Sequence, residues 1–227
     1  MTKFFFALFF SLLTASVAPV FAQHEYAPIE EKTVNYKDWT FKNLSDGTSV
    51  NLRQFAQGKK LVMVVYFASW CPNWRNEAPV AKALYDKYHK DGLEIIGVSE
   101  YASLADAKNF FGPEGPAYTV VSESEARDQR EKTTHFNYRK AVGDGRNWGS
   151  PWNIFLEPAK LKAKGDVLAE KAYVVSGELI EADVDKFIRE RLGLPAATAA
   201  VAMPNAGTPT PCEPAKPAKP ATAFKKP

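Results

Sequence analysis

The chain has 227 residues, of which 45% are hydrophobic, and a formal charge of +3 at pH 7. The positive excess lies at the two ends, in Lys3 and in a lysine-rich segment after position 195, so the central part is close to neutral. This argues against a basic nucleic-acid-binding surface on the folded part, and we expect no nucleic-acid partner.

The first residues have the pattern of a secretory signal. Lys3 is followed by the apolar run Phe4–Leu13, and small residues before the cut predict cleavage between Ala22 and Gln23, which makes 1–22 a signal peptide. A periplasmic or secreted protein is therefore expected. The alternative is an uncleaved membrane anchor, because the apolar stretch could nearly span a bilayer. Only in that case do we expect a membrane partner.

The composition changes again at Pro195. The segment 195–227 holds half of the chain's 16 prolines, many alanines and few large apolar residues. Such a segment cannot bury enough surface to offset the entropy of ordering, which predicts a disordered tail. Its lysines could contact anionic envelope polymers, but a solvated tail is the simpler expectation. The remaining residues, 23–194, are enough for one domain with a sizeable core.

Between these ends, apolar runs alternate with helical periods. The run Leu61–Phe67 has no polar alternation and predicts a strand buried on both faces, and the period becomes helical after Pro72. In chain order we expect a hairpin over 39–48, a helix at 52–55, a strand at 61–67, a helix to 91, a strand at 93–98, a helix at 104–111, a strand at 118–121, a polar helix at 123–142, a strand at 152–156, one or two strands in 167–175 and a helix at 180–192. This order predicts an α/β domain with a parallel strand–helix–strand unit.

Cys71 is the residue around which this pattern is organised. It lies where the buried strand passes into the helix that begins at Pro72. Unpaired backbone N–H groups and the positive end of the helix dipole meet a side chain at this position. Both favour the thiolate over the thiol, and the thiolate is the reactive form of cysteine. We therefore expect Cys71 to be a nucleophile.

The segment around Cys71 resembles a known active site. Residues 70–79 read W-C-P-N-W-R-N-E-A-P, which is similar to the W-C-x-x-C-R-x-E-x-P segment of TlpA-like thiol:disulfide interchange proteins, a periplasmic branch of the thioredoxin superfamily. Trp74 stands where that family has its second cysteine. The sequence Gly149-Ser150-Pro151 looks like the family's cis-proline loop, and the resemblance covers roughly Asp38 to Gly193.

The resemblance implies a fold and an activity. The fold would be the thioredoxin fold, a central mixed sheet flanked by helices, with an N-terminal β-hairpin extension. The activity would be thiol–disulfide exchange with protein or small-molecule thiols and disulfides, without a cofactor, through Cys71 and Pro151. Family proteins use a glutamate at the position of Glu77 to tune the thiols, although Glu77 could equally be a solvated helix carboxylate. The polar residue that such proteins often carry six positions before the cysteine is replaced by Val65.

The chain has only two cysteines, Cys71 and Cys212. A dithiol site completes exchange because its second thiol attacks the mixed disulfide. With Trp74 in that position, Cys71 can start an exchange but cannot finish it locally. Cys212 in the tail is a candidate resolving thiol, because a flexible tail of this length could reach Cys71. The alternative is that Cys212 stays free or forms intermolecular pairs.

Four of the five tryptophans flank the two segments that the resemblance brings together. We expect an aromatic rim for substrate, made by Trp70, Trp74, Trp148 and Trp152, because such side chains suit an apolar or peptide ligand. Trp74 and Trp148 are expected to be the more exposed. At least one of Trp70 and Trp152 is expected to pack the fold instead.

Other chemistries fit the residues less well. A peroxidatic cysteine needs a threonine or serine three positions earlier and a proline seven earlier, where this chain has Ala68 and Val64. A copper-chaperone pair needs a cysteine at Arg75. The three histidines have no ligand spacing, so we expect no metal site. Two functions remain: exchange through the single nucleophile Cys71, or a catalytically degenerate binding or chaperone-like module that uses the aromatic rim.

Overall fold

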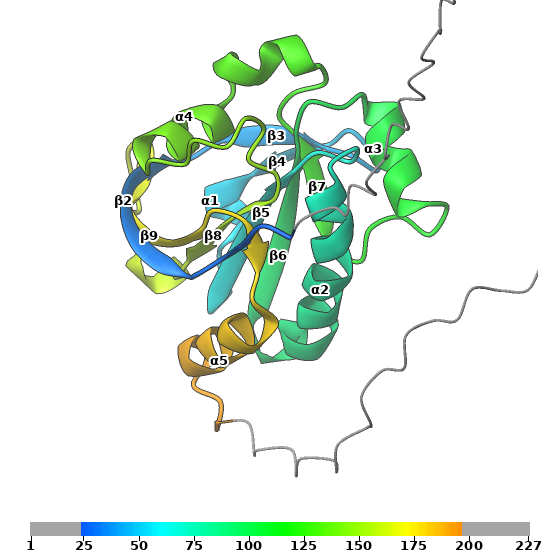
Figure 1. Ribbon diagram of the computed structural model, residues 1–227. Coiled ribbons are helices and arrows are strands. Elements are labelled where there is room, and N and C mark those ends of the chain that lie inside the picture. The colour runs from blue at the N-terminus through cyan, green and yellow to red at the C-terminus, as the bar shows by residue number, and fades with distance from the viewer. Residues whose placement is uncertain (1–23, 197–227) are drawn as a thin grey trace, which may run out of the picture. The chain divides into compact units, whose positions relative to one another are not determined.

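The computed structural model describes residues 24–196 (Figure 1). The predicted signal segment, nearly all of the predicted tail and Cys212 lie outside the described residues. Within the described part, no helix is both long enough and apolar enough to cross a bilayer.

The centre of the molecule is an eight-stranded mixed sheet with the order β2-β9-β8-β5-β6-β7-β3-β4, beside a two-stranded sheet of β1 and β10. The strands are β1 (Tyr26–Ala27), β2 (Glu30–Lys37), β3 (Thr40–Asn43), β4 (Ser49–Asn51), β5 (Leu61–Phe67), β6 (Leu93–Ser99), β7 (Thr119–Ser122), β8 (Trp152–Leu156), β9 (Val167–Val175) and β10 (Glu178–Leu179). β5, β6 and β7 are parallel, whereas β8 is antiparallel to β5. All seven residues of β5 are buried, as expected for a strand covered on both faces.

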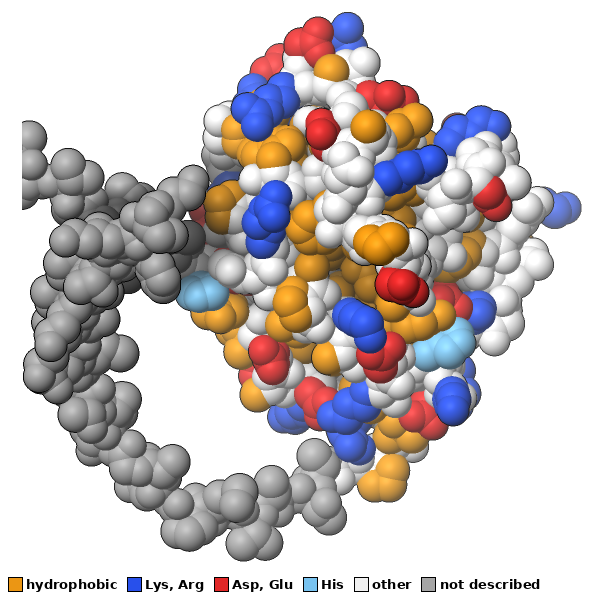
Figure 2. All heavy atoms as spheres, turned by 90° about the vertical axis from the view of Figure 1, so that its right-hand side faces the viewer, with side chains coloured by type: hydrophobic (Ala, Val, Ile, Leu, Met, Phe, Trp, Pro, Cys, Tyr) orange, Lys and Arg blue, Asp and Glu red, His pale blue; other side chains and the backbone are white. Residues whose placement is uncertain are grey.

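Helices cover both faces of the sheet (Figure 1). They are α1 (Leu52–Phe55), α2 (Pro72–Tyr88), α3 (Leu104–Phe111), α4 (Thr134–Ala141) and α5 (Glu181–Leu192), with 3₁₀ turns η1 (His89–Asp91), η2 (Arg127–Lys132) and η3 (Pro158–Lys160). α2, α3 and α5 pack in one apolar core, and α1 and α4 contribute to a second core on the opposite face. On the surface that α2 and α3 form, hydrophobic side chains lie among charges of both signs (Figure 2).

Two sequence-based predictions differ from the structure. The predicted helix at 123–142 is instead η2 followed by α4, because Thr133 takes an extended backbone and accepts the Phe136 N–H as the N-cap of α4. Strand β2 was not predicted. Only Val34 and Tyr36 of its eight residues are buried, so the apolar pattern is short, and the pairing register with β9 shifts between Thr33 and Tyr36, where Asn35 has a φ of 49°. The segment 167–175 is a single strand, β9.

The other predicted elements are present within a few residues of their expected bounds. The hairpin of β3 and β4 lies at one edge of the sheet, and β5, α2 and β6 form the parallel unit that positions Cys71. The mixed sheet flanked by helices that the resemblance implied is therefore confirmed.

Candidate active site

Cys71 is the N-cap residue of α2. Its backbone is extended, with φ of −75° and ψ of 127°, and Pro72 occupies the first turn, where proline is best tolerated. The side chain is 8% exposed, and Sγ donates a hydrogen bond of 3.0 Å to the carbonyl oxygen of Ser150. The thiol therefore lies at the positive end of the helix dipole and against the loop that precedes β8.

That loop holds Pro151 and is tied to the end of β5. The Ser150–Pro151 peptide bond is cis, and Ser150 Oγ accepts the N–H of Ala68 at 2.8 Å. Gly149 has a φ of 56°, and a Cβ at this position would lie 1.8 Å from Arg139 Nε. Glycine is needed here because both the backbone conformation and the approach of the guanidinium exclude a side chain.

Two arginines, the buried Arg139 and the partly buried Arg146, hold the same loop. Arg139, 2% exposed, donates to the carbonyl of Trp148 at 2.9 Å and to Asp144 at 3.0 Å. Arg146 donates to Asp144 at 2.8 Å and to the carbonyl of Pro151 at 3.1 Å. Burial alone would raise the pKa of Asp144, but the hydrogen bonds from the two arginines outweigh it and hold this pKa at about 2. No sequence motif predicts this network.

Trp74 is in the core and not on a rim. Its side chain is fully buried, and its ring is stacked on that of Phe67, with centroids 4.4 Å apart and planes 23° apart. The centroid of the Phe110 ring lies 5.8 Å from that of Trp74. The prediction that Trp74 is exposed and lines a substrate rim is therefore wrong. The residue in the place of the second cysteine fills space beneath the start of α2.

The other tryptophans predicted for the rim divide into a buried one and a half-buried pair. Trp152 is fully buried, so its assignment to the rim is also wrong. Trp70 and Trp148 are half-buried and meet edge to face, with ring centroids 5.2 Å apart, and Trp70 Nε1 donates to the carbonyl of Tyr101 at 3.1 Å. The predicted rim thus reduces to Trp70, which precedes Cys71, and Trp148, which precedes the proline loop.

Glu77 is not a solvated carboxylate. It is 2% exposed, and Oε2 accepts the N–H of Leu179 at 2.7 Å. Burial raises the pKa of Glu77 to about 8, against the opposing effects of Asn153 and the Leu179 N–H. The carboxyl group therefore holds a proton at neutral pH.

Asn153 provides a buried polar side chain next to Val65, the position at which the sequence has an apolar residue. It is fully buried and is paired with Val65 in the β5–β8 ladder. The sequence predicted that a buried polar group was missing at this strand position. The structure instead supplies polar groups nearby, from the adjacent strand and from Glu77 on α2.

A second buried polar cluster, which the sequence did not reveal, supports Trp148. Tyr101 has a φ of 59°, its hydroxyl lies 3.0 Å from His135 Nδ1, and its ring centroid lies 5.4 Å from that of Trp148. His135 is fully buried; burial and the nearby charge of Arg139 lower its pKa well below the usual value, so the imidazole is neutral. The cluster fixes the position of the half-buried tryptophans.

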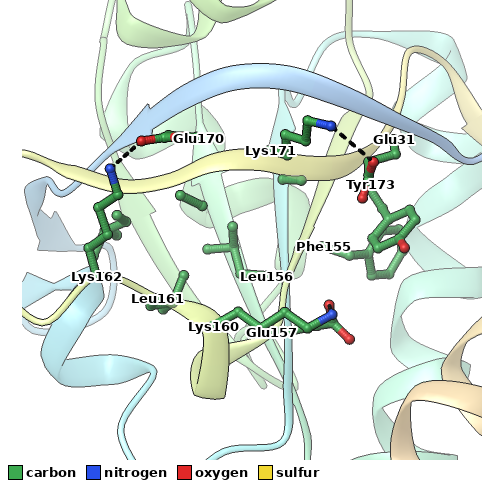
Figure 3. A pocket seen from close by; sticks show the side chains of 13 residues that line it. Glu31, Phe155, Leu156, Glu157, Lys160, Leu161, Lys162, Glu170, Lys171 and Tyr173 are labelled. Carbon is green, nitrogen blue, oxygen red and sulfur yellow. Dashed lines mark hydrogen bonds and ion pairs between the residues drawn. The ribbon is translucent and has the colours of Figure 1, made fainter.

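Two hollows on the surface are large enough to hold a small ligand. One, of about 330 Å³, adjoins the thiol segment and is lined by Ser69, Trp70, Arg75, Asp106, Asn109 and Phe110. The other, of about 320 Å³, has an apolar floor that includes Phe155, Leu156 and Leu161 and is bordered by lysine–glutamate pairs (Figure 3). No cysteine or histidine lines the second hollow. Among residues 24–196, no three metal-ligating side chains are grouped to hold a metal ion.

Comparisons with known proteins agree with this geometry. Thiol-disulfide oxidoreductase ResA of Halalkalibacterium halodurans is 29% identical over 101 residues, which cover 44% of this chain and 54% of that protein. The chain thus matches about half the length of this curated relative.

Solved structures show the fold. A thioredoxin family thiol:disulfide interchange protein of Chlorobium tepidum has 21% identity and a TM-score of 0.50, over 76% of this chain and 100% of that one. A secreted thiol-disulfide isomerase of Corynebacterium glutamicum has 18% identity and a TM-score of 0.50, over 70% and 85%. The fold is therefore thioredoxin-like. The family model described as Redoxin matches residues 29–145, more than half of the chain, and the chain belongs to the Redoxin family.

Proposed function

We propose that this protein catalyses thiol–disulfide exchange through the single nucleophile Cys71. The observation that carries the proposal is the position of Sγ, at the N-cap of α2 and 3.0 Å from the Ser150 carbonyl of the cis-proline loop. The Ser150 carbonyl accepts the thiol hydrogen bond, so the loop holds the sulfur at the N-terminal end of α2, just after β5.

The exchange has two steps. The Cys71 thiolate attacks one sulfur of a disulfide, forms a mixed disulfide and releases the other sulfur as a thiolate. A second thiol then attacks the mixed disulfide, and Cys71 leaves as a thiolate. Since Trp74 is buried in the place of a local resolving cysteine, the second thiol must come from elsewhere. We propose either a thiol of the partner or Cys212, which lies outside the described residues.

Glu77 is proposed to tune the site. A carboxyl group with a pKa of about 8 changes charge in the pH range in which thiols react, and it lies on the same helix as Cys71. Ionisation of Glu77 would place a negative charge in the core beside α2, which disfavours the thiolate. Pro151 is proposed to shape the face on which a partner disulfide meets Cys71.

Two further parts of the proposal, the TlpA-like branch and an exported location, are supported by the sequence. The W-C-x-x-x-R-x-E-x-P pattern supports the TlpA-like branch, and the pattern of 1–22 supports export to the periplasm or beyond. One of the similar structures is of a secreted protein, which is consistent with this proposal.

A binding or chaperone-like module is the second candidate. It is favoured by the low exposure of Cys71 and by the half-buried pair Trp70 and Trp148, which leaves part of two indole rings at the surface. An exchange assay separates the two functions. The mature chain and its Cys71→Ser variant are incubated with a glutathionylated peptide and reduced glutathione, and release of the peptide is followed. Catalysis by the parent that Cys71→Ser lacks supports exchange; equal rates for both support the binding module.

A further inference from the structure

Arginine side chains lie over the half-buried tryptophans beside the thiol. The guanidinium carbon of Arg127 lies 4.1 Å from the ring centroid of Trp70 and 5.8 Å from that of Trp148. Arg130 lies 5.3 Å from the Trp148 ring. Trp70 precedes Cys71 in the chain, and Trp148 precedes the loop whose Ser150 carbonyl accepts the thiol hydrogen bond, so these cations lie over the two tryptophans next to the site.

A further arginine, Arg75, lines a hollow together with Trp70. Arg75 is one turn along α2 from Cys71, whose carbonyl accepts the Arg75 N–H at 3.2 Å. Its guanidinium lies 5.5 Å from the Phe110 ring and lines the hollow next to the thiol segment. Arg75, on α2, and Arg127, on η2, therefore both lie near Trp70, the residue before Cys71.

These two arginines differ from the others near the site. Arg130, Arg139 and Arg146 each form an ion pair with a carboxylate, whereas within residues 24–196 neither Arg75 nor Arg127 does. Both are exposed. Stacking on an aromatic face orders a guanidinium while leaving the N–H donors at its edge available to a carboxylate. Their charges are thus positioned but not neutralised by a direct partner.

The acidic side chains nearby are hydrogen-bonded, ion-paired or exposed. Asp106 shares the hollow with Arg75, but its carboxylate accepts the Ser103 hydroxyl at 2.8 Å at the start of α3. Glu131 pairs with Arg130, and Glu25 pairs with Arg146. Asp128 follows Arg127 in sequence and is exposed. The surface near Trp70 therefore presents two guanidinium groups with unused donors.

We infer that the partner of Cys71 carries carboxylates next to its reactive sulfur, and that Arg127 and Arg75 bind them. This inference rests on the proposed exchange function and specifies its substrate class: an acidic peptide segment around a cysteine. The positive charges attract such a disulfide and stabilise the released thiolate as the mixed disulfide forms. The electrostatic contribution decreases as salt increases, because the groups are exposed.

The test compares three small disulfides as probes of charge. They are 5,5′-dithiobis(2-nitrobenzoate), which carries carboxylates, neutral 4,4′-dithiodipyridine and cationic cystamine. The protein is the mature chain with Cys212→Ser, so that only Cys71 reacts. The variants are Arg127→Gln, Arg75→Gln and both together. Arg191→Gln on α5 is the control for loss of one positive charge away from the site: Arg191 also lies over an aromatic ring, 4.6 Å from that of Tyr173, although it pairs with Glu157 at 3.7 Å.

The expected result is a change of selectivity. Each site variant slows the anionic probe about threefold at low salt, and the double variant about tenfold, as loss of short-range steering predicts. The rate with the neutral probe changes less than twofold, the rate with cystamine rises, and Arg191→Gln matches the parent. An anionic-to-neutral rate ratio that the site variants leave unchanged overturns this inference alone. A parent that reacts with none of the probes overturns the proposed function and this inference with it.

A second arm identifies the source of the carboxylates. The disulfide of a short peptide with aspartates on both sides of its cysteine is compared with the matching asparagine peptide and with glutathione disulfide. Preference for the aspartate peptide over both, lost in the double variant, supports an acidic peptide partner. A preference for glutathione disulfide that depends on the same arginines would contradict the peptide assignment.

Discussion

The ring of Trp74 is stacked on that of Phe67, with centroids 4.4 Å apart, at the position where similar dithiol sites have their second cysteine. Trp74 lies one turn of α2 after Cys71, and its indole adds apolar contacts to the β5–α2 junction where the proposed function would need a resolving thiol. The site is therefore built around one thiol, and its neighbours are arranged for packing.

Trp74→Cys should have two opposite effects. The new thiol lies one turn from Cys71 and should raise disulfide-reductase activity in an insulin-reduction assay well above that of the parent. Loss of a buried indole should cost about 3–5 kcal/mol of unfolding free energy. Trp74→Ser is the control, because it leaves a similar cavity without a thiol. Equal reductase activity in the two variants would show that the site no longer supports a dithiol cycle.

The buried carboxyl of Glu77 predicts a pH dependence of stability. Its pKa is raised from 4.5 to about 8 in the folded state, so between these values the unfolded state loses the proton and the folded state keeps it. The free energy of unfolding therefore decreases as pH rises, by about 1.4 kcal/mol per pH unit between these two pKa values. Glu77→Gln removes this term. Urea unfolding at pH 5 and pH 8 should show a smaller loss of stability in the variant than in the parent; parallel losses would contradict it.

Gly149→Ala tests the support of the proline loop. Comparison with two other glycines of the same loop separates the cost of the positive φ from the cost of the contact with Arg139. Gly145 has open space and an ordinary backbone, Gly143 has open space with a φ of 81°, and Gly149 combines a φ of 56° with the Arg139 contact. We expect Gly145→Ala to be nearly neutral, Gly143→Ala to cost about 1 kcal/mol and Gly149→Ala to cost more than both, with altered reactivity of Cys71. Thermal unfolding and thiol alkylation rates measure this order, and equal effects at 143 and 149 would refute the role of Arg139.

Cys212 tests whether the tail resolves the mixed disulfide. If it does, protein purified from the cell envelope without reductant should contain a Cys71–Cys212 disulfide in the monomer. Non-reducing peptide mapping measures it, with the Cys212→Ser chain as control. Full alkylation of both thiols in the untreated monomer would remove this role and leave the partner's thiol as the resolving one.

The sequence was informative where local patterns decide structure. The apolar run of β5, the proline at the start of α2 and the Gly-Ser-Pro loop were enough to place Cys71 and Pro151. The tryptophans were harder, because burial depends on which side chain faces the core, and the sequence spacing alone does not separate Trp74 from Trp70. Arg139 and Arg146 were missed because their partners are backbone carbonyls and Asp144, a set that carries no motif. Glu77 was located, but its burial depends on β8 and β10, which are distant in sequence.

The most direct test of the account is the reactivity of Cys71 in the folded protein. The mature Cys212→Ser chain is mixed with 4,4′-dithiodipyridine under native conditions, and adduct formation is followed by absorbance and intact mass, beside the rate of global unfolding. We predict one adduct per chain, formed much faster than unfolding and reversed by added thiol. An adduct that forms only as fast as the protein unfolds would show that Cys71, 8% exposed, is an inert core residue.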